Sequence, residues 1–177
     1  MASSMAGLSP GAPAERAAAL RAAPLLREFT DVGIRILAQA SSGRVVGRGT
    51  YAFRAGEPSK ELSVIARGRL QLLARDGGTA LGEVAAGDAV GGFSLLAGGE
   101  HLVSALAATD VELVVLSRDS FEQLRMTKPG AALKLLIALA NDFAERLREA
   151  RGPLREFLAW QVSRRQAEQS GNRAGGP

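Results

Sequence analysis

The residues best suited to chemistry lie in one glycine-rich stretch. Residues 86–104 read AGDAVGGFSLLAGGEHLVS, with two pairs of consecutive glycines. Glycines beside a short helical turn leave backbone N–H groups free to converge on an anion. The candidate ligand-binding residues are Gly91, Gly92, Phe93, Ser94, His101 and Ser104. We therefore interpret this stretch as a cradle for a ligand.

Few residues could support catalysis. The chain has one histidine and no cysteine, and it lacks the HExxH, GxSxG and GxxxxGK[ST] motifs. His101 alone cannot build a multi-histidine metal site. The carboxylates of Glu83, Asp88 and Glu100 show no spacing that marks an acid/base pair. We predict that the protein is not an enzyme and has no catalytic residues, no metal site and no cofactor.

A series of short strands must position this cradle. From about residue 45 to residue 116, glycine separates short apolar runs about every ten residues, as in turns between strands. We predict strands over 51–54, 62–66, 69–75, 79–84, 102–107 and 111–116. Asp76-Gly77-Gly78 is a predicted hairpin turn. Small antiparallel strands around a closed interior indicate a β-roll, jelly-roll-like and cupin-like.

Helical patterns flank the predicted roll on both sides. Residues 15–39 are rich in Ala, Leu and Arg, Pro24 interrupts them, and Thr30 is placed to cap a helix over 32–39. Ser117 is placed to cap a helix to about residue 125. Pro129 opens a longer helix to about residue 150, and a last helix covers 154–165. The fold class is therefore α+β, an antiparallel β-roll between short N-terminal helices and C-terminal helices.

The sequence divides into four predicted parts. A disordered leader covers residues 1–13, the main domain covers 14–128, the C-terminal helices cover 129–165 and a flexible tail covers 166–177. In the C-terminal helices, apolar residues alternate at three- and four-residue spacing, which is typical of a pairing seam. The predicted dimer seam is Leu136, Phe143, Leu147, Leu154 and Phe157. The alternative is that this stripe packs on the roll.

The charge distribution and the hydropathy of the sequence indicate which classes of partner to expect. The 22 basic and 18 acidic residues are balanced up to Leu116, so the excess lies in the C-terminal region. There arginines alternate with glutamates, which favours a solvated helix face over nucleic acid or a peripheral membrane contact. No apolar window approaches the roughly 20 residues of a membrane span, and we predict a soluble, cytoplasmic protein. Too few residues follow Trp160 for a helix-turn-helix, so sequence-specific DNA binding is not expected.

The glycine framework resembles the cyclic nucleotide-binding domain family from about residue 24 to residue 155. The matching motifs are GE at 56–57, Leu62, IARG at 65–68, GDAVG at 87–91, DVEL at 110–113, Leu116-Ser117 and Phe121. In this family, the segment that corresponds to residues 87–104 is a phosphate-binding cassette. It carries a glutamate that binds the ribose and an arginine that binds the cyclic phosphate. Here Gly92 and His101 occupy those two positions. The resemblance therefore implies that the cradle is kept and its charged anchors are missing.

We consequently predict a non-catalytic regulatory or scaffolding protein for signalling. It would have this domain fold without the family's usual cyclic nucleotide binding, and would act through a homodimer and a protein partner. The alternative is a sensor of a cyclic nucleotide (cAMP or cGMP) or another small anion. Its pocket would use backbone amides, Ser94, His101 and an arginine from elsewhere in the chain.

Overall fold

The computed structural model describes residues 11–149, apart from the side chains of Phe93, Ser94, Ala97 and Leu147. In chain order the elements are α1 (Pro13–Ala22), η1 (Pro24–Leu26), α2 (Asp31–Ala40), β1 (Ser42–Val46), β2 (Tyr51–Phe53), β3 (Glu61–Arg67), β4 (Arg69–Leu73), β5 (Ala80–Ala85), β6 (Ala89–Val90), α3 (Gly92–Ala97), β7 (Ser104–Ala107), β8 (Val111–Ser117), α4 (Arg118–Thr127) and α5 (Pro129–Glu149). The predicted α+β class with a β-roll between helices is confirmed.

Two antiparallel sheets form the roll. One has the strand order β1-β8-β3-β6 and the other β2-β7-β4-β5. Apolar side chains from both sheets meet in one cluster, which we call the roll interior. Its buried members are Val46, Ile65, Leu70, Ala105, Ala107, Val111, Leu113 and Val115. The strands alternate, so the neighbouring side chains of β3 and β8 point to the opposite face of their sheet.

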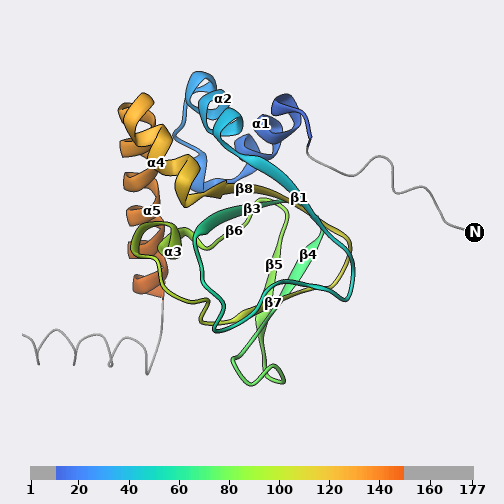
Figure 1. The fold of residues 1–177 in the computed structure, drawn as a ribbon. Helices are drawn as coiled ribbons and strands as arrows, with labels where there is room; N and C mark the ends of the chain where they lie inside the picture. The colour runs from blue at the N-terminus through green and yellow to red at the C-terminus, as the bar shows by residue number, and fades with distance from the viewer. Residues whose placement is uncertain (1–10, 150–177) are drawn as a thin grey trace, which may run out of the picture. The chain divides into compact units, whose positions relative to one another are not determined.

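The opposite face of the first sheet packs against the helices. Leu62 and Val64 of β3 join Val114 and Leu116 of β8 in a second buried cluster, which we call the helix-side core. The helices contribute Leu20, Leu26, Ile34, Leu37, Phe121, Leu124, Ala132, Leu135 and Leu139, among others. Figure 1 shows α1 and α2 above β8 and β3, with β4, β5 and β7 below. Two apolar faces explain why β8 is almost continuously hydrophobic.

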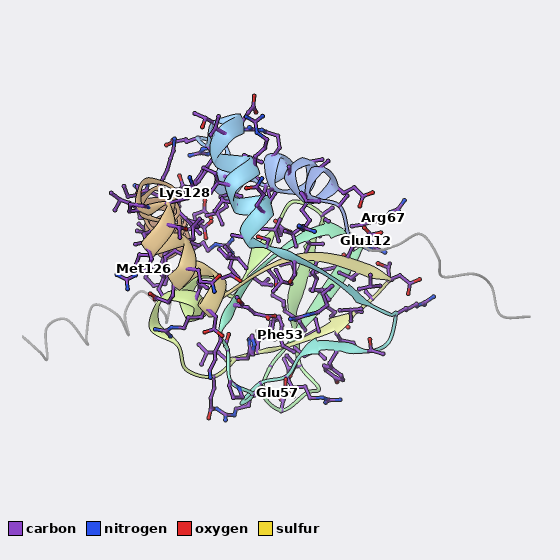
Figure 2. The ribbon with its side chains drawn as sticks, turned by 45° about the horizontal axis from the view of Figure 1, so that its top comes forward. Phe53, Glu57, Arg67, Glu112, Met126 and Lys128 are labelled. Atoms are coloured by element: carbon purple, nitrogen blue, oxygen red, sulfur yellow. The ribbon has the colours of Figure 1, made fainter. Side chains whose placement is uncertain are left out.

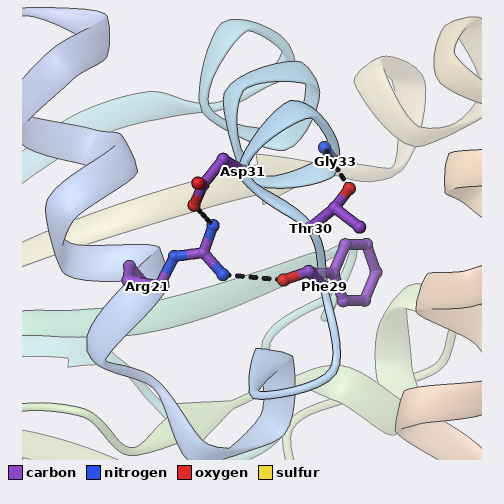
Figure 3. Close-up of polar contacts among 5 residues, drawn as sticks. All are labelled: Arg21, Phe29, Thr30, Asp31 and Gly33. Atoms are coloured by element: carbon purple, nitrogen blue, oxygen red, sulfur yellow. Dashed lines mark hydrogen bonds and ion pairs between the residues drawn. The ribbon is translucent and has the colours of Figure 1, made fainter.

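Polar contacts fix the connection between α1 and α2 (Figure 3). Arg21 pairs with Asp31 and donates a hydrogen bond to the Phe29 carbonyl at 2.7 Å. The Thr30 hydroxyl accepts a hydrogen bond from the Gly33 amide at 3.2 Å and caps α2. The predicted cap at Ser117 is confirmed in the same way, because its hydroxyl accepts from the Ser120 amide at the start of α4.

The strands follow the sequence pattern closely, with two omissions. All six predicted strands are present, and the predicted turn at Asp76 joins β4 to β5, with its carboxylate accepting from the amides of Gly78 and Thr79. No strand is predicted over residues 42–46, but Ser42–Val46 form β1, an edge strand paired with β8. The two-residue strand β6 was also missed. Strand β7 begins at Ser104 rather than at residue 102.

The chain forms two compact units, Met1–Leu139 and Ala140–Pro177, which divide within α5. The predicted division at residues 128 and 129 stays a prediction. The predicted leader lies largely outside the described residues, and the last helix and tail lie wholly outside them. Within residues 11–149, no helix combines the length and the hydropathy that a membrane crossing requires.

Candidate functional site

The first half of the glycine-rich stretch forms the turn between β6 and α3. Gly91 has a φ of +82°, a conformation that side chains disfavour. A Cβ atom at this position would lie 2.2 Å from the backbone oxygen of Glu61. Only glycine therefore allows the cassette backbone to approach β3 this closely.

Gly92, the first residue of α3, faces the helix-side core. A Cβ atom on Gly92 would lie 2.6 Å from Leu139 Cδ2 and 3.7 Å from Leu62 Cδ1. Leu139 is 6% exposed and belongs to the helix-side core. The volume that a side chain of Gly92 would need is therefore filled by α5.

His101 lies largely buried beside the strand β2. Its side chain is 9% exposed and stacks on Phe53 of β2, with ring centroids 4.0 Å apart and an angle of 11° between the rings. Burial lowers the pKa of His101, while the negative charges of Glu61 and Glu57 act in the opposite direction. The ring is therefore held mostly neutral near pH 7.

Backbone contacts fix this half of the stretch to the turn that follows β2. The His101 carbonyl accepts from the Gly56 amide at 2.8 Å, and the His101 amide donates to the Glu57 carbonyl at 2.9 Å. Ser104 is buried, and its hydroxyl accepts from the Ala55 amide at 2.9 Å. In Figure 2, Phe53 and Glu57 lie on the same side of the roll. His101 and Ser104, two of the predicted ligand-binding residues, thus hold this part of the stretch to the turn after β2.

The predicted ligand-binding residues fall into two groups. Gly91 and Gly92 lie together at the start of α3, while His101 and Ser104 hold the loop to the turn after β2. Phe93 and Ser94 lie in α3, but their side chains are outside the described part of the chain. The backbone framework of the cradle is present, and its role in binding stays a prediction.

A polar group that the sequence reasoning missed lies at the start of β3. Arg44 of β1 makes two hydrogen bonds to the Glu61 carboxylate, at 2.6 and 2.7 Å. These bonds raise the pKa of Arg44. Two residues earlier, the Ser59 side chain is fully buried and its hydroxyl has no hydrogen-bond partner. The only sequence signal is a polar residue at every second position, Ser59, Glu61 and Ser63.

A groove of about 360 Å³ lies elsewhere, where the β3–β4 turn meets the start of β8. It is lined by Val45, Arg67, Gly68, Thr109, Asp110, Val111 and Glu112. Figure 2 shows Arg67 and Glu112 beside each other, and their side chains are 3.6 Å apart. Residues 11–149 contain no group of three or more acidic or histidine side chains arranged for a metal ion.

The predicted dimer seam is only partly described. Leu136 is half-buried and packs on the helix-side core, whereas Phe143 is 49% exposed. The side chain of Leu147 is not described, and Leu154 and Phe157 lie outside residues 11–149. The larger exposed apolar side chains at the start of α5 are instead Leu133, 58% exposed, and Ile137, 53% exposed. Leu136 therefore contributes to the domain's own core, and the predicted seam stays a prediction.

Comparisons with known proteins agree with this architecture. Residues 43–128 match the family model of the cyclic nucleotide-binding domain. An uncharacterised NTE family protein of Mycobacterium tuberculosis is 27% identical over 123 residues, which are 70% of this chain and 21% of that protein. A cGMP-dependent protein kinase of Caenorhabditis briggsae is 38% identical over 76 residues, 43% of this chain and 10% of the kinase. The chain thus spans about a fifth or less of the length of these relatives.

Solved structures show the same likeness. The N-terminal domain of a transcriptional regulator from Streptomyces coelicolor has a TM-score of 0.66 at 26% identity, covering 76% of this chain and 98% of that domain. The catabolite activator protein of Thermus thermophilus has a TM-score of 0.65 at 26% identity, covering 80% of this chain and 63% of that protein. The family-model match and these structures together identify the β-roll of this chain as a cyclic nucleotide-binding domain in its fold.

Proposed function

We propose that this chain is a non-catalytic regulatory module that does not bind cyclic nucleotide in the usual manner of its family. The observation that carries the proposal is the packing of Leu139 against Gly92, where a Cβ atom on the glycine would lie 2.6 Å from the leucine Cδ2. The position where the family places its ribose-binding glutamate thus faces the apolar helix-side core. Burying an ionised carboxylate among these apolar side chains would be strongly unfavourable.

The second anchor position offers no fixed cation. His101 stacks on Phe53, and burial lowers the pKa of its ring. Charge-assisted hydrogen bonds contribute roughly 1.5–3 kcal/mol each, so the loss of two anchors weakens binding by about 3–6 kcal/mol. At about 1.4 kcal/mol per decade, this corresponds to a factor on the order of 10² to 10⁴. Such weakening would remove a micromolar sensor from its working range.

Calorimetric titration of the full chain with cAMP, cGMP and cyclic dinucleotides tests this proposal. We expect no saturable binding at micromolar ligand. A catabolite activator protein titrated with cAMP under the same conditions provides the positive control. A dissociation constant in the micromolar range or below would overturn the proposal and favour the alternative, a sensor with a non-standard pocket.

Regulation without this ligand requires a protein contact, and α5 is a suitable place for one. Leu133 and Ile137 form an exposed apolar stripe on α5, one helical turn apart. Small and apolar residues at three- and four-residue spacing suit the pairing of two helices. We therefore place the homodimer contact of the proposed module on this stripe.

Light scattering coupled to size exclusion tests the contact. We expect the full chain to elute at twice its mass of 18.4 kDa, and the double variant Leu133→Gln/Ile137→Gln to elute as a monomer. Leu81→Gln is the matched control, because Leu81 is similarly exposed, at 56%, but lies on β5. A monomeric parent chain, or a double variant that still dimerises, would show that this stripe does not pair two copies.

A further inference from the structure

A row of polar side chains lies on the face of β3 that looks into the roll. Leu62 and Val64 belong to the helix-side core, so the alternating residues Glu61 and Ser63 face the roll interior with Ile65. Ser59, two residues before Glu61, has a fully buried side chain between the exposed Pro58 and Lys60. One end of an otherwise apolar interior is therefore polar.

Arg44 faces the same side of the sheet from β1. It is paired in register with Leu113, which is paired in turn with Ile65, and both partners are buried in the roll interior. Directly opposed residues in a sheet share a face. The two-point contact with Glu61 thus lies at the polar end of the roll interior, where 41% of the arginine side chain and 21% of the glutamate side chain are exposed. Solvent and small solutes can reach the guanidinium.

Stability does not explain these polar groups. A partly buried ion pair loses solvation that its attraction only roughly repays, and apolar residues of similar size are often as stable. The unpartnered hydroxyl of Ser59 is unfavourable in the free protein, because a buried donor has lost its hydrogen bonds to water. A site that exchanges partners accounts for both features, since a ligand would supply the acceptors that are now missing.

We propose that Arg44 binds a small oxyanion, a carboxylate or a phosphate monoester, which displaces the Glu61 carboxylate from the guanidinium. The planar guanidinium presents parallel N–H donors that fit two oxygens of such an anion, and Glu61 now occupies both positions. Ser59, two residues from Glu61, can donate its hydroxyl proton to the bound anion. The charged pair comes from β1 and β3, and Ser59 lies just before β3.

This arrangement predicts opposite effects for the two charged partners. Glu61 is tethered beside Arg44 and competes at a high effective concentration, so the unmodified chain should bind weakly, with a millimolar dissociation constant. Glu61→Gln removes the competing charge and should tighten binding by about tenfold or more. The double variant Glu61→Gln/Arg44→Gln should bind at least about tenfold more weakly than Glu61→Gln. The double variant leaves neither charge unpaired.

The test is an NMR titration of the full-length variants with methyl phosphate and, separately, with acetate, at constant ionic strength. The backbone amide signals of β1 and β3 around residues 44 and 61 report binding in every variant, whether or not Glu61 carries its charge. Sodium chloride controls for unspecific screening. Arg69→Gln in the Glu61→Gln background is the matched control, because Arg69 forms an exposed pair with Glu83.

The affinities of these variants for the two anions decide whether Arg44 binds an oxyanion. Saturable shifts that Glu61→Gln tightens and the double variant loses would support it, and the stronger of the two probes would identify the class of anion. Equal affinity in Glu61→Gln and the double variant, no saturation in Glu61→Gln, or an equal loss in the Arg69→Gln control would overturn it. Tight cAMP binding that is unchanged by Arg44→Gln would contradict the proposed function without bearing on this site.

Discussion

Substitution of Gly92 tests the contact between the cassette and Leu139 of α5. In Gly92→Ala, the new methyl group would lie 2.6 Å from Leu139 Cδ2, well inside van der Waals contact, while the backbone φ is compatible with a side chain. Because Leu139 is buried and cannot simply swing into solvent, we expect the free energy of unfolding to fall by about 1–3 kcal/mol, the usual cost of overpacking. Gly92→Glu adds a carboxyl group to the same apolar surroundings and should lose a further 1–3 kcal/mol or so.

Urea unfolding of a small set of variants measures these quantities. Leu139→Ala should cost about 2–5 kcal/mol by itself. The double variant Gly92→Ala/Leu139→Ala should be more stable than the sum of the single losses by roughly 1–2 kcal/mol, because the clash has been removed. Gly47→Ala is the control, since a Cβ there meets nothing within 4 Å. Strict additivity, or a Gly92→Ala variant as stable as the parent chain, would refute the contact. So would a Gly92→Glu variant that gains cAMP binding at unchanged stability.

Three further predictions concern the neighbouring residues. Gly91→Ala should lower the free energy of unfolding in urea by at least about 2 kcal/mol, because its φ is +82° and the Glu61 oxygen leaves no room. Ser59→Ala should raise it by about 1 kcal/mol, whereas Ser104→Ala, which loses a hydrogen bond to the Ala55 amide, should lower it by a similar amount; the reverse order would contradict the assignment. Burial lowers the pKa of His101 from 6.5, so its contribution to stability is complete above that pH and is lost as the pH falls; unfolding at pH 7.5 and 5.5 should show this difference in the parent chain and less of it in His101→Phe.

The fold could be predicted because its signals are local. Glycine at each turn, Asp76 in the hairpin and the caps at Thr30 and Ser117 each determine a few residues of backbone, and each is where the sequence placed it. Strand β1 was missed because Ser42-Gly43 carry no strand propensity of their own. They become a strand through pairing with Val115 and Val114 of β8, some 70 residues later.

The candidate site could be predicted only as far as its backbone. The glycines of the cassette mark close approaches that the sequence pattern contains, as at Gly91. The contact between Gly92 and Leu139 depends on how α5 lies against the first sheet, and no local pattern determines that. The stacking of His101 on Phe53 brings together residues from separate segments, and so does the pairing of Arg44 with Glu61. Such side-chain partners become known only once the strand register is known.

The position of Leu139 links the cassette to the proposed pairing surface without a ligand. Leu139 fills the space beside Gly92, and Ile137, two residues earlier on the same helix, is exposed to solvent. A rigid helix transmits a shift along its length, so a partner that moves this part of α5 would also change the contact between Leu139 and the cassette. The apolar contact between Leu139 and Gly92 can couple the two surfaces, which is why Gly92→Ala should alter the dimerisation proposed for α5 as well as stability.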